Sequence, residues 1–165
     1  MGAADILSIV GEDVWKNYYK FTVIRNPFDK MISLFFFIEK INNKKSRFRR
    51  IIRNIVRNGR KNEIERFRSW VRRRGEPRDR NKYLIDGKEC VDYFIRYEEL
   101  NEGIRHVCDV LSIPYEPSRI PHYKSGIRNK RIALEHFYDS ETIAVVEKRF
   151  AWEIERFGYQ PPKPQ

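Results

Sequence analysis

The fold is decided by residues 20–37, KFTVIRNPFDKMISLFFF, which predict a buried strand that turns into a helix. The run from Phe21 to Ile24 is short and largely apolar, which is typical of a covered strand. Asn26 is a favourable N-cap and Pro27 suits the first helical position. This pattern indicates the strand-to-helix junction of an open α/β sheet.

Two side chains of this junction can bind an anion. Arg25 stands at the carboxyl end of the strand and Ser33 lies two turns into the helix, so both can face the crevice in which open α/β sheets bind ligands. The helix N-terminus adds backbone N–H donors. A phosphate monoester would satisfy all three groups, but an ion pair of Arg25 and a packing role of Ser33 explain the same residue types equally well.

The surrounding residues resemble a known family in four ordered segments. Residues 15–37 resemble the 3'-phosphate-binding segment of sulfotransferases, in which an Arg and a Ser eight positions later hold the 3'-phosphate of 3'-phosphoadenosine 5'-phosphosulfate (PAPS). Arg25 and Ser33 keep that spacing. Three further segments resemble landmarks of the carbohydrate-type sulfotransferases in the right order: YFIRYEEL at 93–100, PHYKSGIR at 121–128 and FAWEIERFGY at 150–159.

The resemblance implies a fold and an activity. The implied fold is α/β and P-loop NTPase-like, with a parallel sheet flanked by helices. The implied reaction moves a sulfuryl group from PAPS to a hydroxyl of an anionic or neutral carbohydrate-like acceptor, without a metal. Arg25 and Ser33 would hold the 3'-phosphate. Lys124, Ser125 and Arg128 would close over the nucleotide, with a lysine at 124 where the family has an Asn.

One landmark of the family is missing. The family begins with a strand and a loop resembling Pro-Lys-x-Gly-Thr-[ST], which cradles the 5'-phosphosulfate, and no such loop precedes residue 20. The expected sheet is therefore incomplete at the N-terminus, which would leave unpaired backbone groups and exposed apolar side chains. A truncated or mis-started sequence, a fragment complemented by another chain and a degenerate, inactive relative all stay open.

Sulfuryl transfer to a hydroxyl benefits from a general base. The candidates are His122, in the loop that resembles a cofactor-lining region, and Glu98, at the start of a helix after a strand. A structural loop histidine and a favourable N-terminal charge explain the same two residues without catalysis. His106 and His136 lie in helical context, where packing or solvent exposure is the expected role.

Positive charge is concentrated in one segment. Residues 44–80 hold 16 Lys and Arg against 4 Asp and Glu, whereas the rest of the chain holds 18 against 19. Apolar residues at helical spacing predict two amphipathic helices in this segment, interrupted at Gly59 and with arginines facing solvent. Their apolar stripes are Phe48, Ile51, Ile52, Ile55 and Val56, then Ile64, Phe67, Trp70 and Val71.

Such a basic surface attracts anionic partners, here a polysaccharide, nucleic acid or an acidic membrane face. The alternative function is therefore a non-catalytic basic module that binds nucleic acid or an anionic polysaccharide. Nucleic-acid binding of that kind would weaken steeply with salt and would not depend on Arg25. A nucleotide kinase relative is disfavoured because the sequence has no Walker-type loop.

Composition is that of one globular domain. With 41% hydrophobic residues the chain can bury a core, and it has neither a bilayer-spanning apolar run nor a signal peptide, so we expect a cytoplasmic protein. We expect one sulfotransferase-like domain over residues 1–160, with a basic helical insertion at 44–80 and a disordered tail at 161–165. Cys90 and Cys108 have no metal-ligand spacing and are expected to be reduced packing residues.

Local patterns predict the remaining elements. These are a helix over 3–10, a hairpin of 82–85 and 88–95 around Asp86-Gly87, a helix over 98–111, a loop over 113–130, and a last helix capped by Ser140 with Ile143, Val146, Phe150 and Ile154 facing inward.

Overall fold

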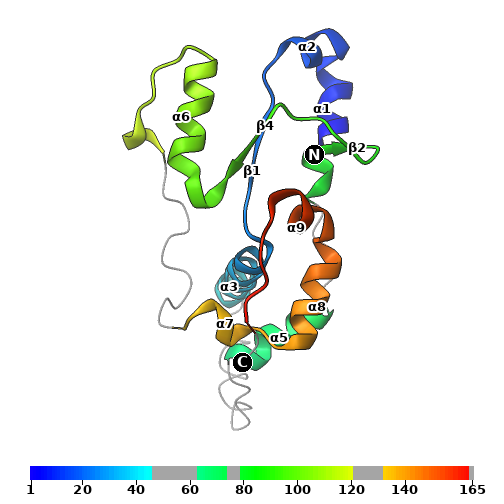
Figure 1. Ribbon diagram of the computed structural model, residues 1–165, viewed down its shortest axis with the longest axis vertical. Coiled ribbons are helices and arrows are strands. Elements are labelled where there is room, and N and C mark those ends of the chain that lie inside the picture. The colour runs from blue at the N-terminus through cyan, green and yellow to red at the C-terminus, as the bar shows by residue number, and fades with distance from the viewer. Residues whose placement is uncertain (46–62, 74–78, 121–131, 164–165) are drawn as a thin grey trace. The chain divides into compact units, whose positions relative to one another are not determined.

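The computed structural model describes residues 1–45, 63–73, 79–120 and 132–163, with side chains described outside 43–45 (Figure 1). These residues form two compact units. Unit 1 comprises Met1–Arg25 and Glu76–Pro121, and unit 2 comprises Asn26–Gly75 and His122–Gln165.

Unit 1 contains the small parallel sheet. Strand β1 (Phe21–Ile24) pairs in parallel with β4 (Tyr93–Arg96), and Ile24 lies opposite Arg96. The predicted strand at Phe21 to Ile24 is thus confirmed, and the described part of the chain has a mixed α/β architecture with a parallel sheet flanked by helices.

The prediction that this strand is covered is wrong for two of its residues. Ile24 is buried, but Phe21 is 46% exposed and Val23 is 48% exposed. Among the described strands, β1 has a partner on one edge only. Val23 shares a face with Ile95 of β4, and α6 (Leu100–Val110) covers the β4 side of that face.

A glycine allows α6 to approach β4 closely. A Cβ atom at Gly103 would collide with Cγ2 of Ile95, whose side chain is fully buried. The helix predicted over 98–111 is found as a 3-10 turn η3 (Tyr97–Glu99) followed by α6. Close packing here fixes the strand that precedes η3.

The predicted hairpin is shorter than expected. β2 (Leu84–Ile85) pairs with β3 (Lys88–Glu89) in antiparallel fashion, and Asp86 and Gly87 have φ values of 50° and 76°, as a type I′ turn requires. The expected second strand divides, because residues 93–96 leave the hairpin and join β1 as β4.

The other elements of unit 1 are short. Helix α1 (Ala3–Val10) has the predicted bounds, and α2 (Glu12–Asn17) follows it. Besides η3, 3-10 turns are found at η2 (Arg80–Lys82) and η4 (Pro117–Arg119). Turn η4 lies inside the predicted loop, of which residues 121–130 are outside the described ranges.

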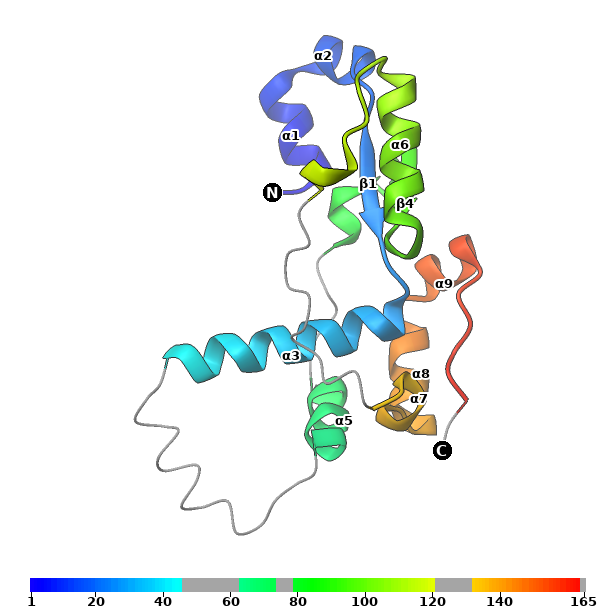
Figure 2. The ribbon, with the colours of Figure 1, turned by 90° about the vertical axis from the view of Figure 1, so that its left-hand side faces the viewer.

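Unit 2 is helical and is organised around α3 (Pro27–Lys45). The side chain of Asn26 accepts a hydrogen bond of 2.9 Å from the backbone N–H of Phe28, which confirms Asn26 as the N-cap. The other helices are α5 (Glu63–Arg73), α7 (Leu134–Phe137), α8 (Ser140–Arg149) and α9 (Ala151–Phe157), and α5, α7 and α8 pack on α3 (Figure 2).

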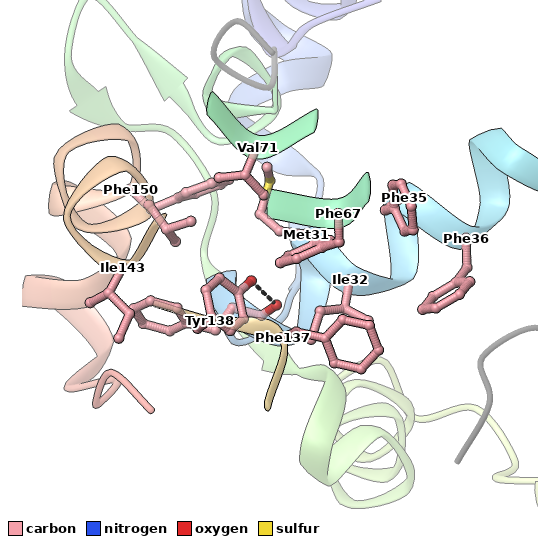
Figure 3. Close-up of a cluster of buried hydrophobic side chains, with 12 residues drawn as sticks. Met31, Ile32, Phe35, Phe36, Phe67, Val71, Phe137, Tyr138, Ile143 and Phe150 are labelled. Carbon is pink, nitrogen blue, oxygen red and sulfur yellow. Dashed lines mark hydrogen bonds between the residues drawn. The ribbon is translucent and has the colours of Figure 1, made fainter. Parts of the chain in front are cut away.

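The core of unit 2 is centred on Phe67 of α5 (Figure 3). The Phe67 ring lies 5.5 Å from Phe35, 5.5 Å from Phe137 and 5.1 Å from Tyr138, in edge-to-face contacts. The Tyr138 hydroxyl donates a buried hydrogen bond of 2.7 Å to the carbonyl of Phe28. The first turn of α3 is therefore tied directly to the core.

Two features of the last helical region differ from the prediction. The N-cap of α8 is Asp139 and not Ser140, because the Asp139 carboxylate accepts from the backbone N–H of Thr142 at 2.8 Å. The predicted single helix also ends at Arg149, and α9 follows after Phe150. Ile143, Val146 and Phe150 are buried as predicted, and Ile154 is partly buried.

The second of the two predicted basic helices is α5, with Phe67 and Val71 buried; the first lies outside the described residues. The prediction that its arginines face solvent is wrong in part. Arg68 donates to the carbonyls of Phe137 and Tyr138 at 3.1 and 3.2 Å. Some of the positive charge of α5 is therefore used to hold unit 2 together.

Candidate functional site

The carboxyl end of the parallel sheet brings two functional side chains together. Arg25 directly follows β1 and Tyr97 directly follows β4, and the strands end side by side because Ile24 is opposite Arg96. The guanidinium carbon of Arg25 lies 4.3 Å from the centroid of the Tyr97 ring. Such a distance is that of a cation–π contact.

This contact is placed where ligands bind in α/β sheets. Arg25 is half-buried and Tyr97 is 45% exposed, so the pair stands at the accessible rim of unit 1. Ligands of open α/β sheets bind outside the carboxyl ends of the parallel strands. An arginine whose face rests on a ring can bond an oxyanion through its edge.

Sequence reasoning identified Arg25 and missed Tyr97. The sequence contains a signal for Tyr97, because it predicts a strand before Arg25 and another before Tyr97. Parallel pairing of these two strands would place Arg25 and Tyr97 side by side. The pairing itself required the split of the predicted hairpin, which the local pattern did not indicate.

Ser33 lies in unit 2, two turns into α3, and is partly buried. Arg25 therefore belongs to unit 1 and Ser33 to unit 2. That both side chains bind one phosphate stays a prediction. Lys124, Ser125 and Arg128 lie outside the described residues.

The sequence model that defines the sulfotransferase family matches residues 8–160 of the chain, which include Arg25, Ser33 and nearly all of both units. The chain belongs to the sulfotransferase family. The resemblance seen in the sequence is thereby confirmed at the family level, and the chain is a transferase of that family. No curated protein and no solved structure matches it.

The candidate bases of this sulfotransferase differ in how they are placed. Glu98 is exposed in η3, directly after β4, so it lies at the same end of the sheet as Arg25. His122 lies outside the described residues. His106 is exposed and its ring lies 4.4 Å from Tyr93, and His136 is exposed in α7.

The opposite end of the sheet is clamped by Lys20 and Asp92. The Asp92 carboxylate accepts from the Lys20 backbone N–H at 2.7 Å and pairs with its Nζ at 2.9 Å. Burial by itself raises the pKa of Asp92, but the hydrogen bonds and charge of Lys20 outweigh it, so that the pKa lies below its ordinary value. This clamp fixes the register that sets Arg25 beside Tyr97.

The cysteines lie in unit 1, where Cys108 is buried in α6 and burial raises the pKa of the half-buried Cys90 thiol. In the described ranges, His, Cys, Asp and Glu side chains form no group of three that could hold a metal. The helices of those ranges are too short or too polar to cross a bilayer.

Proposed function

We propose that this sulfotransferase binds PAPS and transfers its sulfuryl group to a hydroxyl of a carbohydrate-like acceptor. The family match over residues 8–160 supports both the reaction class and the view that units 1 and 2 form one domain over 1–160. The observation that carries the proposal is the position of Arg25, at the carboxyl end of a parallel strand and in cation–π contact with Tyr97.

The residues at this rim fit a phosphate group. The Tyr97 ring restrains the face of the Arg25 guanidinium, so less side-chain entropy is lost when the edge binds an anion. In the proposed complex, Arg25 and Ser33 hold the nucleotide 3'-phosphate. Lys124, Ser125 and Arg128 are proposed to close over the nucleotide, on the resemblance of their loop to the family.

PAPS supplies the sulfuryl group: the acceptor oxygen bonds to sulfur while the bond from sulfur to the bridging phosphate oxygen breaks. The chain's own task is to position the reactants and to hold the charge that develops. A base receives the proton of the acceptor hydroxyl, and Glu98 and His122 are the proposed candidates. A cytoplasmic location stays a prediction from the sequence.

The test is calorimetric titration with adenosine 3',5'-bisphosphate and with adenosine 5'-monophosphate, which lacks the 3'-phosphate. Replacing Arg25 by Ala should weaken bisphosphate binding by about tenfold or more, because a charge-assisted hydrogen bond is lost. Binding of the monophosphate should change little. Ser33→Ala should show the same selectivity with a smaller loss.

The matched control is Arg119→Gln, which removes an arginine of unit 1 whose side chain is 78% exposed. It should bind both nucleotides as the wild type does. Equal bisphosphate affinity in the wild type and in Arg25→Ala would refute the assignment of Arg25.

A further inference from the structure

A pocket of about 250 Å³ lies in unit 2 between α3 and α5, and no residue of the proposed nucleotide site lines it. Its lining comes from Phe35, Ile38, Glu39 and Asn42 of α3, and from Arg66, Ser69, Trp70 and Arg73 of α5. Both sets follow the spacing i, i+3, i+4, i+7, which places four side chains on one face of each helix. The pocket is thus built by two facing helical stripes.

The pocket is separate from Ser33. An α-helix turns by about 100° per residue, so Ser33 lies roughly 170° around α3 from the middle of the stripe that lines the pocket. A ligand of the pocket and a phosphate on Ser33 would therefore contact opposite sides of α3.

An aromatic wall forms one side of the pocket. Trp70 is partly buried, and its ring lies 5.6 Å from Phe35 and 6.2 Å from Phe67. These contacts hold the indole in place while part of it stays exposed. A fixed, partly exposed indole suits the packing of a ring ligand that has apolar faces and polar edges.

The polar lining carries an excess of positive charge. Its two guanidinium groups, Arg66 and Arg73, stand against one carboxylate, Glu39, which pairs with Arg66 at 3.2 Å. Arg73 is exposed and is held along α5 by a bond of 3.0 Å from its Nε to the carbonyl of Ser69. This balance favours a ligand that bears a negative group.

Arg66 also carries a hydrogen-bond donor, its Nε–H group, that has no acceptor within the described part of the chain. The Nε atom is buried. A buried N–H without an acceptor is unfavourable, so a small turn of this side chain toward a ligand oxygen would be compensated.

We propose that the pocket between α3 and α5 binds one acidic sugar ring, a uronate or a sulfated hexose, of a saccharide chain. The choice of a sugar rests on the proposed carbohydrate-like acceptor, whereas the preference for an anionic ring rests on the lining itself. The volume suits a single ring, since it lies below the range of about 300–1,000 Å³ that larger ligands occupy. The pocket would anchor a saccharide away from the nucleotide.

The experiment is calorimetric titration, at low and moderate salt, with a heparin-derived disaccharide of a uronate and a sulfated glucosamine. Lactose serves as the neutral disaccharide and sodium sulfate as the isolated anion. Arg73→Gln should weaken disaccharide binding by about tenfold, and Trp70→Phe by roughly threefold because the smaller ring covers less of the sugar. Lactose and sulfate should bind at least about tenfold more weakly than the disaccharide.

Two control variants test whether disaccharide binding depends on this pocket. One removes an exposed arginine elsewhere in the chain, and the other removes an arginine of the proposed nucleotide site. Arg119→Gln and Arg25→Ala should both bind the disaccharide as the wild type does. Disaccharide binding that is unchanged in Arg73→Gln and Trp70→Phe, or matched in affinity by sulfate alone, would overturn the proposal. Pocket-dependent binding of the disaccharide in a chain that never binds adenosine 3',5'-bisphosphate would support the pocket and refute the proposed function.

Discussion

Tyr97 is the residue on which the geometry of Arg25 depends most directly. Its ring lies 4.3 Å from the guanidinium carbon, and both residues follow paired parallel strands. An exposed cation–π contact of this kind contributes about 0.5–1 kcal/mol. Its role in the proposed site is to restrict the orientations of Arg25 before a phosphate binds.

Replacing Tyr97 by Leu should therefore weaken binding of adenosine 3',5'-bisphosphate by roughly two- to fivefold, while Tyr97→Phe should retain most of it. Isothermal titration measures both. The matched control is Tyr115→Leu, because Tyr115 makes the corresponding contact with Arg105, at 5.0 Å, elsewhere in unit 1. An equal loss in the Tyr97 and Tyr115 variants would show that the effect is not specific to Arg25.

The contrast between Arg25 and Tyr97 shows what the sequence could reveal of the candidate site. Arg25 and Ser33 could be selected from one local segment and its resemblance to a family. Tyr97 acquires its role from a strand 72 positions further along, since Phe21 pairs with Tyr93, and that pairing depends on tertiary structure. Local patterns do not contain this information.

At the scale of the element, Asp139 joins two helices of unit 2. Its carboxylate caps α8 through Thr142 and also pairs with Arg72 of α5 at 2.9 Å. Burial by itself raises the pKa of Asp139, but hydrogen bonds from Thr142 and the charges of Arg68 and Arg72 outweigh it and lower the pKa below its ordinary value. The ionised carboxylate is therefore the form that stabilises the packing of α8 on α5.

This depressed pKa gives unit 2 a defined pH dependence. A carboxyl with a lower pKa in the folded chain contributes stability above its unfolded value of about 3.9, and that contribution is lost as the pH falls through the folded pKa. Asp139→Asn keeps a good N-cap but removes the charge. It should lower the free energy of unfolding by roughly 1 kcal/mol at pH 7, and by progressively less below about pH 4.

Urea unfolding followed by tryptophan fluorescence at pH 7, 5 and 3 measures this difference. Glu155→Gln, which changes an exposed carboxyl of α9, is the control and should alter stability little at each pH. A difference between Asp139→Asn and the wild type that is as large at pH 3 as at pH 7 would contradict the electrostatic explanation.

The elements also show where sequence reasoning ends. The bounds of α1 and the cap of α3 depend on adjacent residues, and both were predicted correctly. The sequence places the cap of α8 one residue too late, because Asp139 and Ser140 are both good caps and only the reciprocal bonds with Thr142 decide between them. The sequence pattern places the residues of β4 in the hairpin, because their partner strand β1 is distant in the chain.

At the scale of the whole described chain, exposed apolar side chains are unevenly distributed. The large hydrophobic residues that are exposed all belong to unit 1, and unit 2 contributes none within its described residues. They are Met1, Ile6, Ile9, Val10, Val14, Tyr18, Phe21, Val23, Tyr97, Val110, Leu111 and Ile113. The large hydrophobic side chains of the described part of unit 2 are thus buried or partly buried, whereas unit 1 presents an apolar surface that includes strand β1.

The open face of β1 makes this surface testable. Replacing both Phe21 and Val23 by Thr should keep the strand, since Thr favours extended structure, and should change the free energy of unfolding by less than about 0.5 kcal/mol because the side chains are already exposed. It should, however, remove a large part of the fluorescence of anilinonaphthalene sulfonate, a dye that binds exposed apolar surface.

The control introduces two threonines into unit 2, at the exposed positions of Lys148→Thr and Glu155→Thr, and should leave dye fluorescence close to that of the wild type. Dye fluorescence that is equal in the wild type and the Phe21/Val23 variant would mean that this face is covered in solution. In that case other residues of the protein, or a second copy of it, pack on this face of β1. If the fluorescence falls as expected, the face of β1 that carries Phe21 and Val23 is open to solvent up to the rim that carries Arg25.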